Sequence, residues 1–358
     1  NAKNIRAGSP DLFMSMLWSH LKGKIKCTST WHHHAFKYIN VQVYRDVLSL
    51  SLLFNVQHNT FAKEKQSMDS NTFINAVFLC LVNVIFMIAG LFLNSVVIIS
   101  LRRSSQLRKK LCYFMILPLS CFDLAVVAIG HSICIFRTVL WYMDKYEEET
   151  KLIEWMIVIH INVTGFSMSA LLTLSVERFL ALKYPFFHQT AVTKRRLVLF
   201  LTFLVVITAS VALSLFFDRR TYVSATIACL LFVLLLLIYL NYIMYIIAKS
   251  KGEGQTITTT HSQQETKKQE LNLKQISSCS MAVGCFFICS SPAIINRIFH
   301  LISNTFLNDR SDQAFHIWLS TLFDMNSTVN CLIFFWKNSI LRREGMKTVK
   351  CFQSTRTW

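Results

Sequence analysis

The chain has 358 residues, of which 53% are hydrophobic and only 16% are charged. Lys and Arg total 37 against 19 Asp and Glu, so the formal net charge is +18. A charged fraction this small excludes an ordinary soluble enzyme, whereas a basic excess is typical of proteins that bind nucleic acid. A nucleic-acid partner is excluded in turn by the placement of the charges, which avoid the long apolar segments.

Seven apolar blocks are each long enough to cross the ~30 Å hydrocarbon core of a bilayer as a helix. They are Phe73–Leu101, Leu111–Phe136, Trp155–Val176, Leu197–Phe217, Tyr222–Ala248, Ile276–Ser303 and Gln313–Trp336. The blocks hold only three formal charges, Asp123, Arg297 and Asp324. Lipid supplies no water to satisfy backbone groups, so such segments must be helices that pack together. The sequence predicts an all-α, polytopic membrane protein with a seven-transmembrane-helix bundle.

The orientation follows from the basic residues between the blocks. Not counting Arg178, twenty Lys and Arg residues lie in the connections and tail after the first, third, fifth and seventh helices, whereas six, with Arg137 among them, are assigned to the opposite connections. The positive-inside rule then predicts an extracellular N-terminus and a cytoplasmic C-terminus in the plasma membrane. The basic face is expected to lie against anionic membrane lipid.

The chain divides into three predicted parts. Residues 68–336 form the seven-helix domain, and residues 337–358 form a basic cytoplasmic tail with a short amphipathic helix. Residues 1–67 hold no apolar run of spanning length, and we expect this extension to be disordered or not translated, with translation starting at Met68.

Two further segments carry weaker signals. The Gly252–Glu270 stretch is rich in Gln, Thr and Lys and is expected to be a flexible cytoplasmic loop. The run His32-His33-His34 is expected to be solvated rather than to bind metal. Palmitoylation of Cys351, just beyond the basic tail, stays open.

Polar residues inside the blocks are candidates for function, because ionisable groups in lipid usually face the bundle interior or a cavity. Asp123 lies midway along the second block. Neutral oxygen donors that helix periodicity can bring toward it are Asn94, Ser167, Asn326, Ser327 and Asn330. Such a set can hold a sodium ion or a proton, and it can equally form an interhelical hydrogen-bond network without an ion. We expect no other cofactor.

The third predicted helix runs past its apolar block and ends in a segment that holds Glu177-Arg178-Phe179, where an acid beside an arginine can form an ion pair whose release frees the guanidinium. With seven helices, this run resembles the acid-arginine-aromatic motif of the rhodopsin-like (class A) G-protein-coupled receptors. Other matches follow in chain order: Asn94, Leu119 with Asp123, Pro185, Phe286-x-x-Cys289-x-x-Pro292 and Asn326-Ser327-x-x-Asn330.

The resemblance implies a receptor without enzymatic activity, in which ligand binding shifts an inactive–active equilibrium. It implies a heterotrimeric G protein, and also arrestin, as partners. It assigns coupling or switching roles to Glu177, Arg178, Phe179, Pro185, Tyr242, Phe286, Pro292, Asn330 and Phe334. Pro292 is expected to be either the hinge of the sixth helix or a static kink.

The chain departs from the family pattern at several positions. Ser290 replaces a tryptophan, Cys331 a proline and Phe334 a tyrosine. Tyr242 or Tyr245 is expected to supply the partner of Phe334 from the fifth helix. The second outer loop is very short, as in melanocortin-type receptors. These losses leave a second reading open, a seven-helix ligand-binding or scaffold protein that does not couple.

The ligand is restricted by what the outer half of the bundle offers. Candidate contacts are His131, His160, Thr164, Asn296, Arg297 and Asp324. His160 replaces the aspartate of aminergic receptors and Asp324 the lysine of opsins, so neither a monoamine nor retinal is expected. We hypothesise that His160 and Asp324 form a charge pair across the pocket, the alternative being two separately satisfied groups. Arg297 is expected either to meet an anionic ligand or to extend to the outer interface.

Two other classes fit the sequence less well. Transporters commonly show repeated halves and broken helices, and neither is evident here. A membrane metallohydrolase needs clustered His and acids, for which His131, His160 and Asp324 are thin support. The sequence therefore favours a receptor for an unknown extracellular ligand, either lipid-like or a peptide.

Overall fold

The structure is a computed structural model, and it describes residues 70–145, 150–214, 219–254, 263–303 and 310–354. In these residues the chain is helical and holds no strand. The elements are α3 (Ser70–Arg103), α4 (Ser105–Lys109), α5 (Leu111–Ala125), the π-helical η1 (Val126–Gly130), α6 (His131–Tyr142), α7 (Thr150–Lys183), α8 (Pro185–Ala191), α9 (Lys194–Leu213), α10 (Arg219–Gly254), α11 (Gln263–Ser303), α12 (Arg310–Lys337) and α13 (Ser339–Ser354). The predictions for residues 1–67 and Met68 lie outside the described residues.

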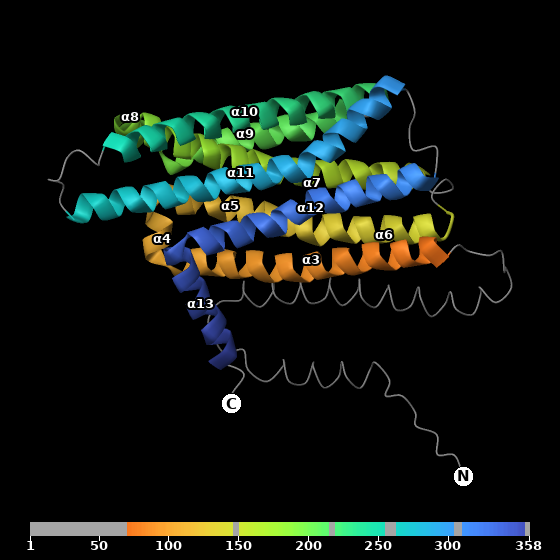
Figure 1. The fold of residues 1–358 in the computed structure, drawn as a ribbon, viewed down its shortest axis with the longest axis horizontal. Helices are drawn as coiled ribbons and strands as arrows, with labels where there is room; N and C mark the ends of the chain where they lie inside the picture. The colour runs from red at the N-terminus through yellow and green to blue at the C-terminus, as the bar shows by residue number, and fades with distance from the viewer. Residues whose placement is uncertain (1–69, 146–149, 215–218, 255–262, 304–309, 355–358) are drawn as a thin grey trace, which may run out of the picture. The chain divides into compact units, whose positions relative to one another are not determined.

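The long helices run side by side as a bundle (Figure 1). Five stretches are long and apolar enough by themselves to cross a membrane: Ser70–Arg103, Leu111–Tyr142, Lys151–Lys183, Arg220–Ser250 and Ile276–Ser303. Two further helices complete the bundle, because α9 packs against α7, and α12 packs against α11, α3 and α6. The prediction of an all-helical bundle is confirmed.

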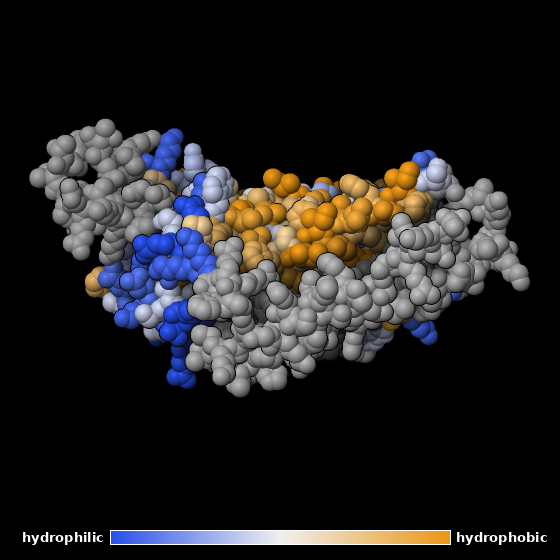
Figure 2. All heavy atoms as spheres, turned by 90° about the horizontal axis from the view of Figure 1, so that it is seen from below, coloured by the Kyte–Doolittle hydropathy of each residue, from blue (hydrophilic) through white to orange (hydrophobic). Residues whose placement is uncertain are grey.

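Large apolar side chains cover the outside of the bundle. Among the exposed ones are Phe78, Ile85, Phe92, Phe203, Phe232, Leu235 and Ile295. Figure 2 shows a broad hydrophobic band on one face, with hydrophilic residues gathered at the end where α4 and α13 lie. Water would make so large an apolar surface unfavourable, so the band is a lipid-facing surface.

The two ends of the bundle differ in charge. The basic end is the end at which α3 finishes with Arg102 and Arg103, α7 finishes with Lys183 and α9 begins with Lys194. The cavity end is the opposite end, toward which the pocket described below lies. Both names are kept throughout.

One helix boundary agrees with the prediction and another differs from it. α7 ends at Lys183, so Glu177 and Arg178 are helical, as expected for the end of the third helix. The predicted flexible loop Gly252–Glu270 is helical over residues 252–254, at the end of α10, and over residues 263–270, at the start of α11. That part of the loop prediction is wrong, because Gln, Glu and Lys are polar but favour helix.

The second spanning helix holds two features that the sequence analysis missed. Pro118 lies inside α5, and the five residues of η1 follow as a π-helical turn before α6 begins. A π-turn adds a residue to the helical repeat and so rotates the following segment about the axis. Arg137, predicted in an outer connection, instead lies inside α6 and is 0% exposed.

The predicted helix after the seventh span is confirmed as α13, and hydrogen bonds join it to the bundle at the residue before its start and again in its second half. Tyr113 Oη of α5 donates to Asn338 Oδ1 at 2.9 Å, just before α13. Ser100 Oγ of α3 lies 3.2 Å from Thr348 Oγ1. The side chain of Cys351 lies outside the described residues, so its palmitoylation stays untested.

Candidate functional site

A cavity lies between α7, α10, α11 and α12 and holds about 530 Å³ of empty space, its mouth included. Its lining residues are His160, Ile161, Thr164, Gly165, Met168, Leu230, Ala293, Ile294, Asn296, Arg297, His316, Leu319, Ser320 and Phe323. Four of the six predicted ligand contacts are among them, whereas His131 and Asp324 are not. The sequence analysis missed His316 and Ser320, which lie one turn apart on α12. No motif marked them; only their helical spacing could have.

The cavity lies far from the basic end. His160 precedes Arg178 by eighteen residues on α7, which is about 27 Å along the helix axis at 1.5 Å per residue. Most of the depth of a bilayer therefore separates the cavity from the acid-arginine motif.

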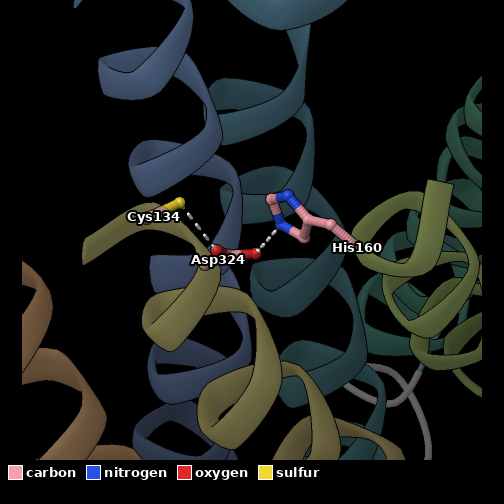
Figure 3. Close-up of side chains that lie close together, drawn as sticks. All are labelled: Cys134, His160 and Asp324. Carbon is pink, nitrogen blue, oxygen red and sulfur yellow. Dashed lines mark hydrogen bonds and ion pairs between the residues drawn. The ribbon is translucent and has the colours of Figure 1, made fainter. Parts of the chain in front are cut away.

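His160 of α7 and Cys134 of α6 both reach Asp324 of α12 (Figure 3). His160 Nε2 lies 2.5 Å from Asp324 Oδ1, and Cys134 Sγ lies 3.6 Å from Asp324 Oδ2. All three residues are buried. An ionised carboxylate only accepts hydrogen bonds, so both the imidazole and the thiol donate to it. The predicted contact between His160 and Asp324 is present, with Cys134 as an additional partner.

A glycine makes this contact possible. At Gly130, the last residue of η1, an added Cβ would lie 2.7 Å from Asp324 Oδ2 and 2.8 Å from Oδ1. The backbone therefore approaches the carboxylate more closely than any residue with a side chain allows. Cys134, His160 and Asp324 also offer three donor atoms within 4.8 Å of one another, of the kinds that zinc uses. Both carboxylate oxygens already have protein partners, His160 on α7 and Cys134 on α6. We call this hydrogen-bonded cluster, which joins α6, α7 and α12, the lock.

His131 takes a different place from the one predicted. Its Nδ1 lies 2.7 Å from Asn83 Oδ1, and Asn83 Nδ2 donates to Thr321 Oγ1 at 2.9 Å. His131 is 0% exposed and faces this interhelical network instead of the cavity. The π-turn immediately before it sets the face that it presents. His131 was predicted to contact the ligand, but it does not line the cavity. Through Asn83 it instead links α6 to α3 and α12.

The second buried carboxylate, Asp123, lies deep in the bundle and is 1% exposed. Ser167 Oγ of α7 donates to its Oδ1 at 2.5 Å, and Ser327 and Asn330 of α12 lie beside it. Three other buried amide oxygens have no hydrogen-bond partner among the described residues: Asn94 Oδ1, Asn326 Oδ1 and Asn330 Oδ1. The structure thus brings Asp123 together with three of its predicted companions and leaves amide oxygens with unused acceptor capacity.

At the basic end, Arg178 is held by its neighbour Glu177. Arg178 Nε and a terminal nitrogen each lie 2.5 Å from a different oxygen of Glu177, and the two residues are 8% and 0% exposed. His188 Nε2 adds a contact of 3.0 Å to Glu177 Oε1. Pro185 is the first residue of α8 and begins the turn that carries His188. The sequence analysis missed His188, eleven residues beyond the acid.

A comparison with models of protein families identifies the family of the helical bundle. Residues 93–334 match the model of the 7 transmembrane receptor (rhodopsin family). The chain belongs to this rhodopsin family of seven-transmembrane receptors. The seven spans of this family agree with the seven predicted from the sequence, of which α9 and α12 fall outside the five stretches that are apolar enough by themselves. The members of the family are receptors and not enzymes, and this receptor is a multi-pass membrane protein.

The receptor's sixth spanning helix, α11, joins the cavity to the interior. Phe286 is 2% exposed, and its ring packs edge-on against Phe323 with centroids 5.9 Å apart. Phe323 in turn lines the cavity. Pro292 lies inside α11, which bends along its length (Figure 1). Proline removes one backbone donor and is a common cause of such a bend.

Other predicted switch residues lie as follows. Phe334 of α12 is buried, but Tyr242 and Tyr245 of α10 are 61% and 63% exposed. The expected partnership of these tyrosines with Phe334 is therefore corrected, since both side chains face outward from the bundle. Phe179 packs edge-on against Tyr184 with ring centroids 6.3 Å apart. With Cys331 in place of proline, α12 is continuous from Arg310 to Lys337.

Proposed function

We propose that this receptor transmits the binding of an extracellular ligand to a heterotrimeric G protein. Arg178 is the residue that meets the G protein once it leaves Glu177. The observation that carries the proposal is the buried Glu177–Arg178 pair, because a guanidinium held by its own neighbour is ready for release without unfolding the helix. Losing the pair has an energetic cost, since both groups are buried.

Contacts beside Arg178 support a closed starting state. Ser175 Oγ of α7 lies 3.3 Å from Cys279 Sγ of α11, one turn before Arg178, and both residues are buried. Nearby, Ser280 Oγ of α11 donates to Asn241 Oδ1 of α10 at 3.0 Å. Separation of α11 from α7 and α10 would break both contacts and open the basic end.

The path from the cavity to the basic end runs along α11. A ligand that displaces Phe323 presses on Phe286, six residues before Pro292 on the same helix. A proline bend is a place where a helix can swing with little loss of hydrogen bonding, so Pro292 acts as the hinge.

The proposal includes an orientation. The basic end faces the cytoplasm, where anionic lipid and the G protein lie, and the cavity end faces outward from the plasma membrane. Membrane lipid contacts the basic end, and arrestin competes with the G protein for the same opened surface.

An allosteric sodium ion at Asp123 belongs to the same proposal. The oxygen donors around it are those that a hard cation prefers, and unsatisfied buried amide oxygens supply acceptor capacity. The ion would neutralise Asp123 and favour the closed state. Replacing sodium by choline is expected to raise basal signalling of the wild type and to leave that of Asp123→Asn unchanged. Equal responses of the two proteins would show that no sodium ion acts at Asp123.

The coupling proposal is tested by recruitment of a panel of engineered Gα subunits to the full chain at the plasma membrane. Arg178→Ala is compared with the wild type at matched surface level, and Arg220→Ala, an exposed arginine at the start of α10, is the control. We expect basal recruitment that Arg178→Ala abolishes and Arg220→Ala retains. Glu177→Gln frees Arg178 without ligand, so silence of Glu177→Gln as well would favour the seven-helix protein that does not couple.

A further inference from the structure

The cavity presents hydrogen-bond donors that lack acceptors. Arg297 lines it and has no hydrogen bond or ion pair among the described residues, and its neighbour Asn296 has a buried Nδ2 without a partner. A guanidinium carries five N–H donors and no acceptor, and an amide nitrogen only donates. An unpaired donor away from water is costly, as at Asn296 Nδ2, and beside the partly buried Arg297 it points to a ligand that accepts.

Arg137 makes the opposite wall a donor surface as well. Its NH2 lies 2.9 Å from His316 Nδ1, and its NH1 donates to Ser320 Oγ at 3.3 Å. Arginine only donates, so His316 Nδ1 must be the unprotonated acceptor and His316 Nε2 must carry the hydrogen. The Ser320 oxygen already accepts from Arg137, which leaves its own hydroxyl hydrogen to donate. Both residues line the cavity.

Carboxylates that would neutralise this surface are absent from the cavity lining. None of the lining residues is acidic. Asp324, the nearest acid on α12, has one oxygen against His160 and the other against Cys134. Tyr222 lies close enough to Arg297 to interact with it, but its buried hydroxyl has no hydrogen-bond partner within the described part of the chain and carries no charge. Within the described residues, the cavity therefore combines a cation that no carboxylate balances with several hydrogen-bond donors.

Apart from Thr164 and His160, the remaining lining is apolar. Met168, Leu230, Ile294 and Phe323 cover the side of the cavity that faces the bundle core. A pocket of this kind favours a ligand with an apolar body and one polar group that fixes its orientation.

From these observations we infer that the cavity binds a small amphiphilic carboxylate, whose anionic group lies between Arg297, Asn296 and His316. The inference deepens the proposed function, on which it rests for the assumption that this cavity is the receptor's ligand site. Arg297 lies five residues beyond Pro292, so a carboxylate that draws Arg297 toward α12 moves the outer part of α11 about the proposed hinge.

The test measures binding to the purified full chain in lipid nanodiscs, without G protein, by the shift of its unfolding temperature. The water-soluble probe is 3-phenylpropanoate, compared with its neutral amide and with 3-phenylpropylamine. A second pair, decanoate and decanol, reports whether the carboxylate enters from the membrane. The variants are Arg297→Gln and Arg297→Lys, with Arg220→Gln at the same end as the matched loss of charge.

At least one carboxylate is expected to raise the unfolding temperature of the wild type and of Arg220→Gln, whereas the amide, amine and alcohol do not. Its affinity is expected to fall about tenfold or more in Arg297→Gln, the effect of losing a charge-assisted hydrogen bond, and less in Arg297→Lys.

Several outcomes would overturn the inference. They are stabilisation by the neutral probes as strong as by the carboxylates, equal carboxylate affinity in Arg297→Gln, or no response of the wild type to either carboxylate. If Arg297→Gln does not fold, the comparison of probes on the wild type and Arg297→Lys decides. Failure here with Arg178-dependent recruitment intact removes the ligand class and leaves the coupling proposal standing.

Discussion

At the basic end, the guanidinium of Arg178 lies against the carboxylate of Glu177, whereas at the cavity end the guanidinium of Arg297 has no carboxylate beside it among the described residues. The acid nearest to the cavity, Asp324, is held by His160 and Cys134 instead. One end therefore keeps its arginine neutralised within the protein, and the other presents its arginine to the cavity.

The difference indicates different roles for the two ends in the proposed mechanism. A buried pair is costly to break, so the basic end stays closed until something else stabilises the open form. A cavity whose arginine has no ion pair among the described residues is stabilised by an anion that binds beside that arginine. The edge-on rings of Phe286 and Phe323 lie between the two ends, and in the proposed mechanism they transmit ligand binding in the cavity to the opening of the basic end.

The largest expected effect on stability comes from removing Asp324, the acid that is bound by His160 and Cys134 and not by Arg297. Asp324→Ala leaves His160 and Cys134 buried without their acceptor, and breaking a buried pair typically costs about 3–5 kcal/mol. We expect a large fall in the unfolding temperature of the purified receptor. Asp312→Asn, a partly buried acid at the start of the same helix, is the control and should change it little. A melting curve of Asp324→Ala like that of the wild type would show that the lock contributes no stability.

Gly130→Ala tests the same lock through the backbone. A Cβ at 2.7 Å from Asp324 Oδ2 forces the carboxylate away from Cys134, and overpacking of this kind costs about 1–3 kcal/mol. Gly284→Ala is the matched control, because a Cβ there meets nothing within 4 Å. We expect the unfolding temperature to fall for Gly130→Ala and to stay level or rise slightly for Gly284→Ala. A result in which the two variants shift equally would show that helix propensity, not the close approach, matters at Gly130.

At the basic end, Glu177→Gln should convert the held arginine into an available one. The substitution keeps the size of the side chain and removes the charge, so Arg178 loses about 1.5–3 kcal/mol of charge-assisted bonding. Basal Gα recruitment should rise about tenfold, the equivalent of about 1.4 kcal/mol. The double variant Glu177→Gln/Arg178→Ala should return to silence. A double variant that stays active would show that Arg178 is not the residue that acts.

The sequence predicted the bundle and the motif at the basic end well, for one physical reason each. Spanning helices need about twenty apolar residues, and that length is visible in every block. Glu177 and Arg178 are adjacent in the chain, so their contact needs no knowledge of how helices pack. His188 was missed because its contact with Glu177 depends on the chain reversal that α8 makes after Pro185.

The cavity end was harder to predict because it depends on how each helix is rotated. The apolar block of the second span was ended just before Arg137, so Arg137 was assigned to a loop, although its partners on α12 allow it to be buried. The π-turn η1 rotates α6 and turns His131 toward Asn83, and nothing in hydrophobicity marks such a turn. Tyr242 was assigned to the wrong face of α10 because the sequence does not show how that helix is rotated about its axis.

The smallest expected effect concerns His188, which contacts one oxygen of Glu177 and leaves both bonds of Arg178 in place. His188→Ala should release about 0.5–1 kcal/mol of restraint on the carboxylate, so basal recruitment should rise about two- to fivefold. Gln189→Ala, at the exposed neighbouring position, should leave recruitment unchanged. A fall in recruitment would mean that His188 competes with Arg178 for Glu177. The closed state would then depend on the balance between these two donors and not on Arg178 alone.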